Sequence, residues 1–259
     1  MRIALGVEYD GSRFNGWQAQ PGQRTVQQSL QQAVSVVADA DITVSAAGRT
    51  DAGVHALNQV VHFDTQARRA DRNWLLGINT NLPDDIAVNW VKAVDTQFHA
   101  RFSATKRRYR YLVLNRLCRS ALHHQRMWWF YKPLDIARMQ QAASLMLGQH
   151  DFSALRAKEC QAKSPIKTLD QIQIIRRGDC IAVDVEARSF LHHMVRNIMG
   201  VLMAVGEGKY PPEWVNTVLA SRNRDAAGVT APPEGLFLTE VCYPPEYSLP
   251  TVSAFPVLW

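Results

Sequence analysis

One order of predicted elements occurs twice along this chain, and it limits the possible folds more than any other feature. In the first half, Ile3, Leu5 and Val7 alternate with smaller or polar residues, which predicts a half-buried strand. Thr25 and Gln28, three residues apart, form a capping box, which predicts the start of a helix with one apolar face. Further strands are predicted over 42–46, 57–63 and 86–94, and a further helix over 72–79. This β-α-β-β-α-β order is typical of the ferredoxin-like unit.

The second half repeats this order. Strands are predicted over 107–114, 169–175, 181–187 and 237–243, and helices over 134–147 and from a cap at Ser189 onward. The turn Arg177-Gly178-Asp179 joins two of these strands as a hairpin. We therefore expect an α+β fold, in which two ferredoxin-like halves share a central, mainly antiparallel sheet with a cleft between them. The predicted divisions are 1–104, 105–243 and a C-terminal arm, 244–259, whose apolar end is expected to dock on the protein.

A nine-residue segment between two predicted strands, Gly48–Ala56, carries the candidate chemistry. Its glycines indicate a loop that turns tightly or approaches a ligand closely. Asp51 stands between them with Arg49 and His55 nearby, and a carboxylate beside a guanidinium stays ionised and can act as nucleophile or base. The alternative is an Asx-type turn with a solvated aspartate. A hydrolase pair of Asp51 and His55 is disfavoured, because no second acid or metal cluster accompanies it.

This segment, Gly-Arg-Thr-Asp-Ala-Gly-Val-His-Ala, resembles the catalytic motif of the TruA-type pseudouridine synthases, which isomerise uridines in the anticodon arm of tRNA. Other segments follow in the family's order between residues 1 and 243: Tyr9-Asp10-Gly11, Gly16-Trp17-Gln18, 98–102, 106–111, 190–196 and 233–236. The resemblance implies the pseudouridine synthase fold and conversion of uridine to pseudouridine at tRNA positions 38, 39 and 40. It implies no cofactor and no metal, because the base is detached and rejoined through carbon 5 without gain or loss of atoms.

The resemblance also implies catalytic residues in both halves. Asp51 matches the family's essential aspartate, and Arg196 matches a basic residue that pairs with it. Helical spacing alone places Arg196 off the apolar face and on one side with His192, which is equally typical of a solvated helix face. Tyr109 matches a tyrosine that lies against the target base, although a tyrosine on a strand is most often a core residue. Tyr111 lies on the same side of that strand, and only the resemblance favours Tyr109.

Three segments are implied to bind RNA. Arg49 is suited to hold the displaced nucleotide once the uridine has left its stem. A segment just before the second half places His99 and Arg101 between two aromatic residues, and a basic loop that includes Lys158 corresponds to one that touches tRNA in the family. The expected RNA-binding residues are Arg49, Tyr109, Phe98, His99, Ala100, Arg101, Phe102, Glu159, Cys160, Gln161, Ala162 and Lys163.

Composition limits the class of protein and its partners. The 29 Lys and Arg residues against 23 Asp and Glu give a net charge of +6, which favours an anionic partner such as tRNA. Four cysteines without a CxxC pair fit a reducing cytoplasm and argue against a zinc site. No run of about 18 apolar residues exists, so no membrane association is expected.

Other questions stay open at this stage. Family members are homodimers, and the segment Met127–Tyr131 is either an apolar interface patch or a core strand. Two rival functions are a tRNA-binding or folding chaperone without turnover, and a synthase of the same fold that acts at another RNA position.

Overall fold

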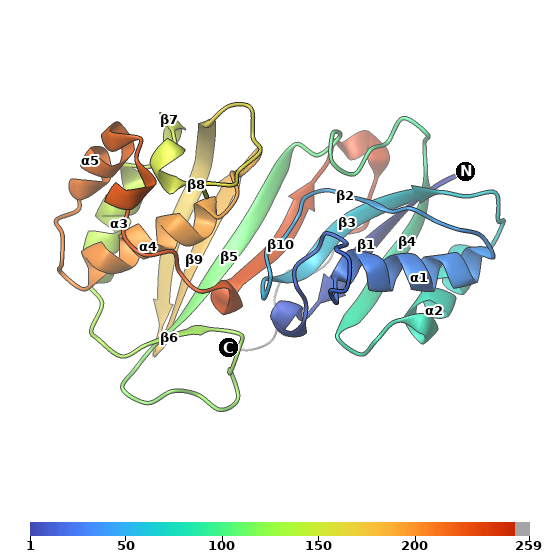
Figure 1. Cartoon of the computed structure of the whole chain (residues 1–259), viewed down its shortest axis with the longest axis horizontal. Helices are drawn as coiled ribbons and strands as arrows, with labels where there is room; N and C mark the ends of the chain where they lie inside the picture. The colour runs from blue at the N-terminus through green and yellow to red at the C-terminus, as the bar shows by residue number, and fades with distance from the viewer. Residues whose placement is uncertain (252–259) are drawn as a thin grey trace. The chain divides into compact units, whose positions relative to one another are not determined.

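The computed structural model describes residues 1–251 and divides into two compact units (Figure 1). The first unit contains Met1–Arg107 together with the chain from Phe237 onward, and the second contains Arg108–Leu236. The strand predicted over 237–243 falls in the first of these units.

The first unit is built on three long antiparallel strands. Strand β1 (Arg2–Tyr9) pairs with β3 (His55–Asp64) on one edge and with β4 (Ile86–Val94) on the other. The other edge of β3, which faces away from β1, pairs with two different strands. The short β2 (Ser45–Ala46) pairs antiparallel with one end of it, and β10 (Leu236–Cys242) pairs parallel with the other. The order β4-β1-β3-β2 is that of the ferredoxin-like unit, as predicted.

Two helices, α1 (Val26–Ala38) and α2 (Asp71–Asn81), pack against each other in this unit (Figure 1). The predicted capping box at the start of α1 is wrong. Thr25 is the N-cap residue, but its buried hydroxyl has no hydrogen-bond partner within residues 1–251. The first amides of α1 are satisfied by backbone instead: Val26 donates to Gly16 and Gln27 donates to Trp17. Because the preceding loop supplies carbonyl acceptors, the cap side chain is not needed.

The predicted strand over 42–46 is also shorter than expected. Only Ser45 and Ala46 pair with a neighbouring strand. The amides of Ile42 and Val44 donate to the side chains of Ser35 and Gln31 on α1. Side-chain acceptors on the helix therefore replace a strand partner for this segment.

The second unit contains the strands β5 (Lys106–Asn115), β9 (Cys180–Ala187), β8 (Ile166–Arg177) and β7 (Gly148–Asp151), in that order. Strands β8 and β9 form the predicted hairpin, with Gly178 at a φ of +56° in its turn. A further strand, β6 (Trp128–Phe130), pairs parallel with β5. The strand alternative for Met127–Tyr131 is therefore correct for its centre. Strand β7 and helix α5 (Trp214–Ser221) were not predicted.

The helices α3 (Ile136–Ser144) and α4 (Met194–Gly206) pack against each other in this unit. The predicted cap of α4 at Ser189 is wrong, because the N-cap is His193, which has a left-handed φ of 61°. Leu191 is buried and His192 is exposed, and both precede the helix in a turn closed by the Met194 amide. The helical spacing argument that joined His192 to Arg196 therefore fails.

The C-terminal arm begins against the first unit. The ammonium of Lys92 donates to the carbonyls of Tyr247 and Ser248, and the Tyr247 ring meets Phe98 edge-on with centroids 5.0 Å apart. The apolar end of the arm lies outside the described residues. Within residues 1–251, no helix combines the length and apolarity that crossing a bilayer requires.

Candidate active site

The loop that carries Asp51 is fixed through its backbone carbonyl oxygens. It connects β2 to β3, and four of its carbonyls accept hydrogen bonds, three from donors elsewhere in the first unit and one from the loop's own backbone. The donors are Arg107 Nη2 to Ala47 at 2.8 Å, Gln59 Nε2 to Gly48 at 2.8 Å, the Trp17 amide to Thr50 at 3.0 Å and the Val54 amide to Asp51 at 3.2 Å. Backbone acceptors held in this way leave the loop little conformational freedom.

Two glycines of the loop after β1 allow this close approach. A β-carbon on Gly11 would lie 1.9 Å from the carbonyl oxygen of Val54. One on Gly16, whose φ is +82°, would lie 2.7 Å from that of Thr50. The Gly53 amide, in turn, donates to the Phe14 carbonyl at 3.3 Å. The long 9–22 loop is therefore packed backbone to backbone against the Asp51 loop.

Side chains on either side of Asp51 are buried and hydrogen-bonded. The hydroxyls of Tyr9 and Thr50 are 2.8 Å apart. His55 is 2 % exposed, stacks on Phe237 with ring centroids 4.6 Å apart, and its Nδ1 accepts the Gly11 amide at 3.1 Å. The buried His55 imidazole is thus held by Gly11 and Phe237. This arrangement does not favour a hydrolase pair with Asp51.

Asp51 itself is half-buried and Arg49 is exposed, whereas Thr50 between them is buried. The loop therefore anchors Thr50 in the core and turns its two charged neighbours outward. A fixed carboxylate at a partly exposed position can attack or deprotonate a bound substrate without first losing conformational freedom.

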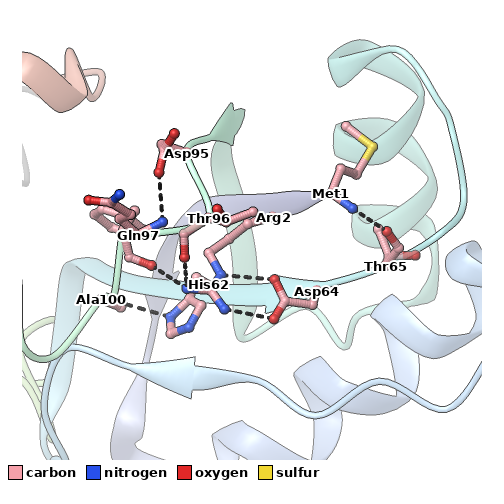
Figure 2. A network of polar contacts seen from close by, with 10 residues as sticks. Met1, Arg2, His62, Asp64, Thr65, Asp95, Thr96, Gln97 and Ala100 are labelled. Carbon is pink, nitrogen blue, oxygen red and sulfur yellow. Dashed lines mark hydrogen bonds and ion pairs between the residues drawn. The ribbon is translucent and has the colours of Figure 1, made fainter.

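The segment 98–102 lies in the same unit and mixes buried and exposed residues. Phe98 and Ala100 are fully buried, so their side chains form the base of the segment. Arg101 and Phe102 are exposed, and the guanidinium carbon of Arg101 lies 5.7 Å from the Phe102 ring centroid. Figure 2 shows the polar network beneath the segment, in which Arg2 and His62 contact its backbone. Phe98 and Ala100 therefore expose no surface of their own, and the exposed surface of the segment belongs to Arg101 and Phe102.

Tyr109 and Tyr111 on β5 have different environments in the second unit. Tyr111 is fully buried, and its hydroxyl donates to the Pro232 carbonyl at 2.6 Å. Burial raises the pKa of Tyr111 well above its usual value, with a smaller contribution from Glu234 in the same direction. Tyr109 is half-buried and meets Phe190 edge-on, with centroids 5.1 Å apart. Tyr111 is therefore committed to the core, and Tyr109 is the one with an accessible surface.

Arg108 and Arg110 alternate with Tyr109 and Tyr111 along β5 and therefore lie on its opposite face. They form ion pairs with Glu186 and Asp184 on β9.

Arg196 is the third residue of α4. Its Nε donates to the Ala231 carbonyl at 2.8 Å, and the Ala231 amide donates to the Arg196 carbonyl at 3.1 Å. This two-way contact fixes the orientation of the half-exposed guanidinium.

The basic loop between β7 and β8 is tied to the residues just before α4. The Ala157 amide donates to the His192 carbonyl at 2.9 Å. The loop exposes Lys158, Glu159, Gln161 and Lys163, whereas Cys160 and Ala162 are half-buried.

Sequence analysis missed the residues that hold the Asp51 loop. Tyr9, Gly11 and Gly16 belong to segments that resemble the family, but no role was assigned to them. Arg107 is only 9 % exposed and donates to the carbonyls of Ala47 and Arg101, both at 2.8 Å. The one available sign was the glycines and the proline spread over the long 9–22 loop, a composition typical of close backbone contact.

Comparison with known proteins gives the family. A family profile described as tRNA pseudouridine synthase matches residues 6–103 and 142–244. The chain is 52% identical over 259 residues, with full coverage of both proteins, to tRNA pseudouridine synthase A of Nitrosococcus oceani. It is 53% identical over 255 residues, 98% of this chain and 94% of the relative, to that of Methylococcus capsulatus. It is 49% identical over 255 residues, 98% of each, to that of Coxiella burnetii. The chain therefore belongs to the tRNA pseudouridine synthase A family of isomerases.

Proposed function

We propose that this protein isomerises uridine to pseudouridine at positions 38, 39 and 40 of the tRNA anticodon stem-loop. Asp51 acts as the nucleophile or base on a uridine that has been flipped out of its stem. One observation carries the proposal. The backbone around Asp51 is held on both sides, by the Trp17 amide at Thr50 and by the Val54 amide at Asp51, while its side chain is partly exposed. End-to-end matches to relatives named tRNA pseudouridine synthase A support it.

The reaction makes modest chemical demands. The bond from ribose to the uracil nitrogen breaks, the base rotates, and carbon 5 is joined to the ribose. Carbon 5 then loses its proton, and the freed ring nitrogen gains one. Atoms and electrons balance without an oxidant, a reductant or a metal. Asp51 has to begin ionised, whether it adds to the base or to the ribose or removes a ribose proton.

Tyr109 and Arg196 complete the proposed site from the second unit. The accessible surface of Tyr109, in contrast to the buried Tyr111, favours it as the tyrosine that lies against the base. A tyrosine in that place offers both stacking and a hydroxyl for proton transfer. Arg196, oriented by its bond to the Ala231 carbonyl, stabilises the carboxylate form of Asp51.

RNA binding is proposed to use exposed cations and one exposed ring. Arg49 fills the place of the flipped uridine, and Arg101 with Phe102 binds backbone and base. Phe98 and Ala100 support that segment from below, and His99 fixes its backbone. The loop that contributes Glu159, Cys160, Gln161, Ala162 and Lys163 makes a further contact with tRNA. Affinity for tRNA should then fall as salt rises, because each phosphate contact releases counterions.

Release of tritium from carbon 5 of uracil in labelled tRNA tests the catalytic assignment. Asp51→Asn should abolish release and leave tRNA affinity within a few-fold. Asp41→Asn is the matched control, since it neutralises an exposed aspartate ten residues away and should change neither quantity. Normal release by Asp51→Asn would contradict the assignment. Wild-type protein that binds tRNA without release would instead favour the chaperone alternative.

The modified positions need a separate experiment. Pseudouridine in tRNA from a strain without this protein should be missing at positions 38, 39 and 40 and restored by the wild-type gene. Loss at other positions would favour the alternative of a related synthase with a different target.

We also infer a homodimer that acts in the cytoplasm. In the segment 116–131, the side chains of Leu117, Leu122, Trp129 and Tyr131 are 79%, 87%, 41% and 57% exposed. Apolar surface of this kind on a small segment is typical of an interface between subunits. Leu122→Glu should produce monomers in analytical ultracentrifugation, whereas Leu147→Glu, at a site 41% exposed between α3 and β7, should not. A monomeric wild-type protein would contradict the inference.

A further inference from the structure

Two histidines of the first unit accept hydrogen bonds from three consecutive amides of the segment 98–103. The Ala100 amide donates to Nδ1 of His62 on β3 at 3.2 Å. The amides of Arg101 and Phe102 donate to Nδ1 of His99 at 3.1 and 3.4 Å. The His62 and His99 rings themselves meet with centroids 4.6 Å apart. Imidazoles thus replace the carbonyl acceptors that such amides normally find in a strand or helix.

Arg2, which lies beside His62 in the same network, fixes the start of this segment, as Figure 2 shows. Its Nη1 donates to the carbonyls of Thr96 and Phe98 at 2.6 and 2.7 Å. Its Nε and Nη2 donate to the carboxylate of Asp64 at 2.8 and 2.7 Å. The carboxylate fixes the guanidinium, and the guanidinium in turn fixes the carbonyls. The network therefore extends from β1 and β3 to the segment 98–103.

Both imidazoles are kept neutral, which is the state that an acceptor needs. His62 is 4 % exposed, and burial lowers its pKa to about 4, with further lowering by His99 and Arg2. Asp64 and a hydrogen bond with the Ser45 backbone oppose this shift but do not outweigh it. Burial also lowers the pKa of His99, with Arg2 acting in the same direction. A protonated imidazole has no lone pair to offer an amide, so neutrality preserves all three bonds.

The segment fixed in this way exposes an aromatic ring and a guanidinium side by side. Phe102 is 74% exposed, and the exposed Arg101 guanidinium lies near its ring. A flexible loop would bury such a ring against the protein, because exposed aromatic area is unfavourable in water. A fixed backbone keeps the ring and the guanidinium outward, where an unpaired base and a phosphate can meet them.

We propose that His62 and His99 are positioning residues for tRNA, which act by fixing Arg101 and Phe102 in the conformation that binds RNA. The inference rests on the proposed function for the identity of the ligand. It adds His62 to the residues already proposed, and it gives His99 a positioning role in place of a direct contact with the uridine.

The test compares three variants on strand β3. His62→Leu removes the acceptor, and His62→Asn keeps an acceptor oxygen at nearly the position of Nδ1. Asn58→Leu is the matched control. Asn58 is also buried, lies four residues away on the same face of β3, and accepts from Trp90 instead of the segment. His62→Leu should raise KM for tRNA about tenfold with kcat within about twofold, the size expected for one hydrogen bond. His62→Asn should restore KM, and Asn58→Leu should not change it.

A double-mutant cycle shows whether the effect passes through the segment. In a protein that already carries Arg101→Gln and Phe102→Ala, His62→Leu should cost little further affinity, because the groups it positions are gone. An undiminished penalty in that background would overturn the proposal. So would equal effects of His62→Leu and Asn58→Leu on KM.

Hydrogen exchange without tRNA separates this proposal from the proposed function. His62→Leu should speed exchange at Ala100, and His99→Leu at Arg101 and Phe102, whereas Asn58→Leu should leave all three amides protected. Unchanged exchange would overturn the positioning role. Faster exchange together with a wild-type protein that neither binds nor modifies tRNA would reject the proposed function instead.

Discussion

Gly16 and Thr50 are in contact through their backbones, although 34 residues separate them. A β-carbon on Gly16 would lie 2.7 Å from the Thr50 carbonyl oxygen, which accepts the amide of Trp17 at 3.0 Å. Thr50 immediately precedes Asp51, so this contact determines the position of the backbone that carries the carboxylate. A residue with a side chain at position 16 cannot make the contact without moving that backbone.

Gly16→Ala should therefore lower both stability and turnover. Its φ of +82° costs an alanine about 1 kcal/mol, and the contact with Thr50 adds a further cost. We expect a loss of about 2–3 kcal/mol by urea unfolding and at least about tenfold in kcat, the latter because Asp51 is displaced.

Gly22→Ala is the control for this substitution. Gly22 has a φ of +70°, but nothing lies within 4 Å of a β-carbon there. It should lose about 1 kcal/mol and keep its kcat. Equal kcat values for the two variants would show that the contact with Thr50 does not position Asp51.

Tyr9→Phe should weaken catalysis through Thr50. It removes one partner of a buried hydroxyl pair 2.8 Å apart, which should cost about 1–2 kcal/mol of stability and reduce kcat several-fold. Thr50→Val removes the other partner. The double variant should be little worse than either single variant in kcat, and additive losses would contradict a joint role.

Arg107→Lys should be strongly destabilising even though the charge is kept. The buried Arg107 guanidinium donates to three carbonyls, those of Ala47, Arg101 and Ala104, and a lysine ammonium cannot reproduce the spacing of its nitrogens. We expect a loss of about 2–3 kcal/mol in urea unfolding. Arg108→Lys is the control, because the side chain of Arg108 is 49% exposed, and its loss should stay below about 1 kcal/mol. Similar losses in the two variants would contradict this account.

Protonation of His62 should lower the free energy of unfolding as the pH falls. Its pKa is about 4 in the folded protein and about 6.5 in an unfolded chain, so the unfolded chain binds more protons between these values. The contribution of neutral His62 to the free energy of unfolding is complete above about pH 6.5 and is lost as the pH falls toward 4. The total loss is at most about 3 kcal/mol. Urea unfolding at pH 7, 6 and 5 should show a steeper decline for wild type than for His62→Asn. Parallel declines would show that His62 does not titrate in this way.

Local sequence patterns predicted those elements whose structure depends on near neighbours. Strand β4 was predicted with its observed bounds, Ile86–Val94, and the two β-α-β-β-α-β repeats supplied most of the other elements. Predictions failed where a distant group satisfied the backbone. The Gly16 and Trp17 carbonyls replace the Thr25 cap, and side chains of α1 replace a strand partner for Ile42 and Val44. The start of α4 at Met194 has a different cause, because a local turn with His193 in a left-handed conformation precedes the helix and helical spacing does not reveal it.

The family, and Asp51 as the candidate carboxylate, can be read from the sequence, because each motif that carries the resemblance is a contiguous segment of the chain. The pairing of β10 with β3, the burial of Tyr111, and the roles of Gly16, Tyr9 and Arg107 in fixing the Asp51 loop are visible only in the folded protein. The difference arises because the groups involved are far apart along the chain. A carbonyl oxygen that needs a donor leaves no trace in its own sequence, and the donors to Thr50 and Ala47 are Trp17 and Arg107, 33 and 60 positions away.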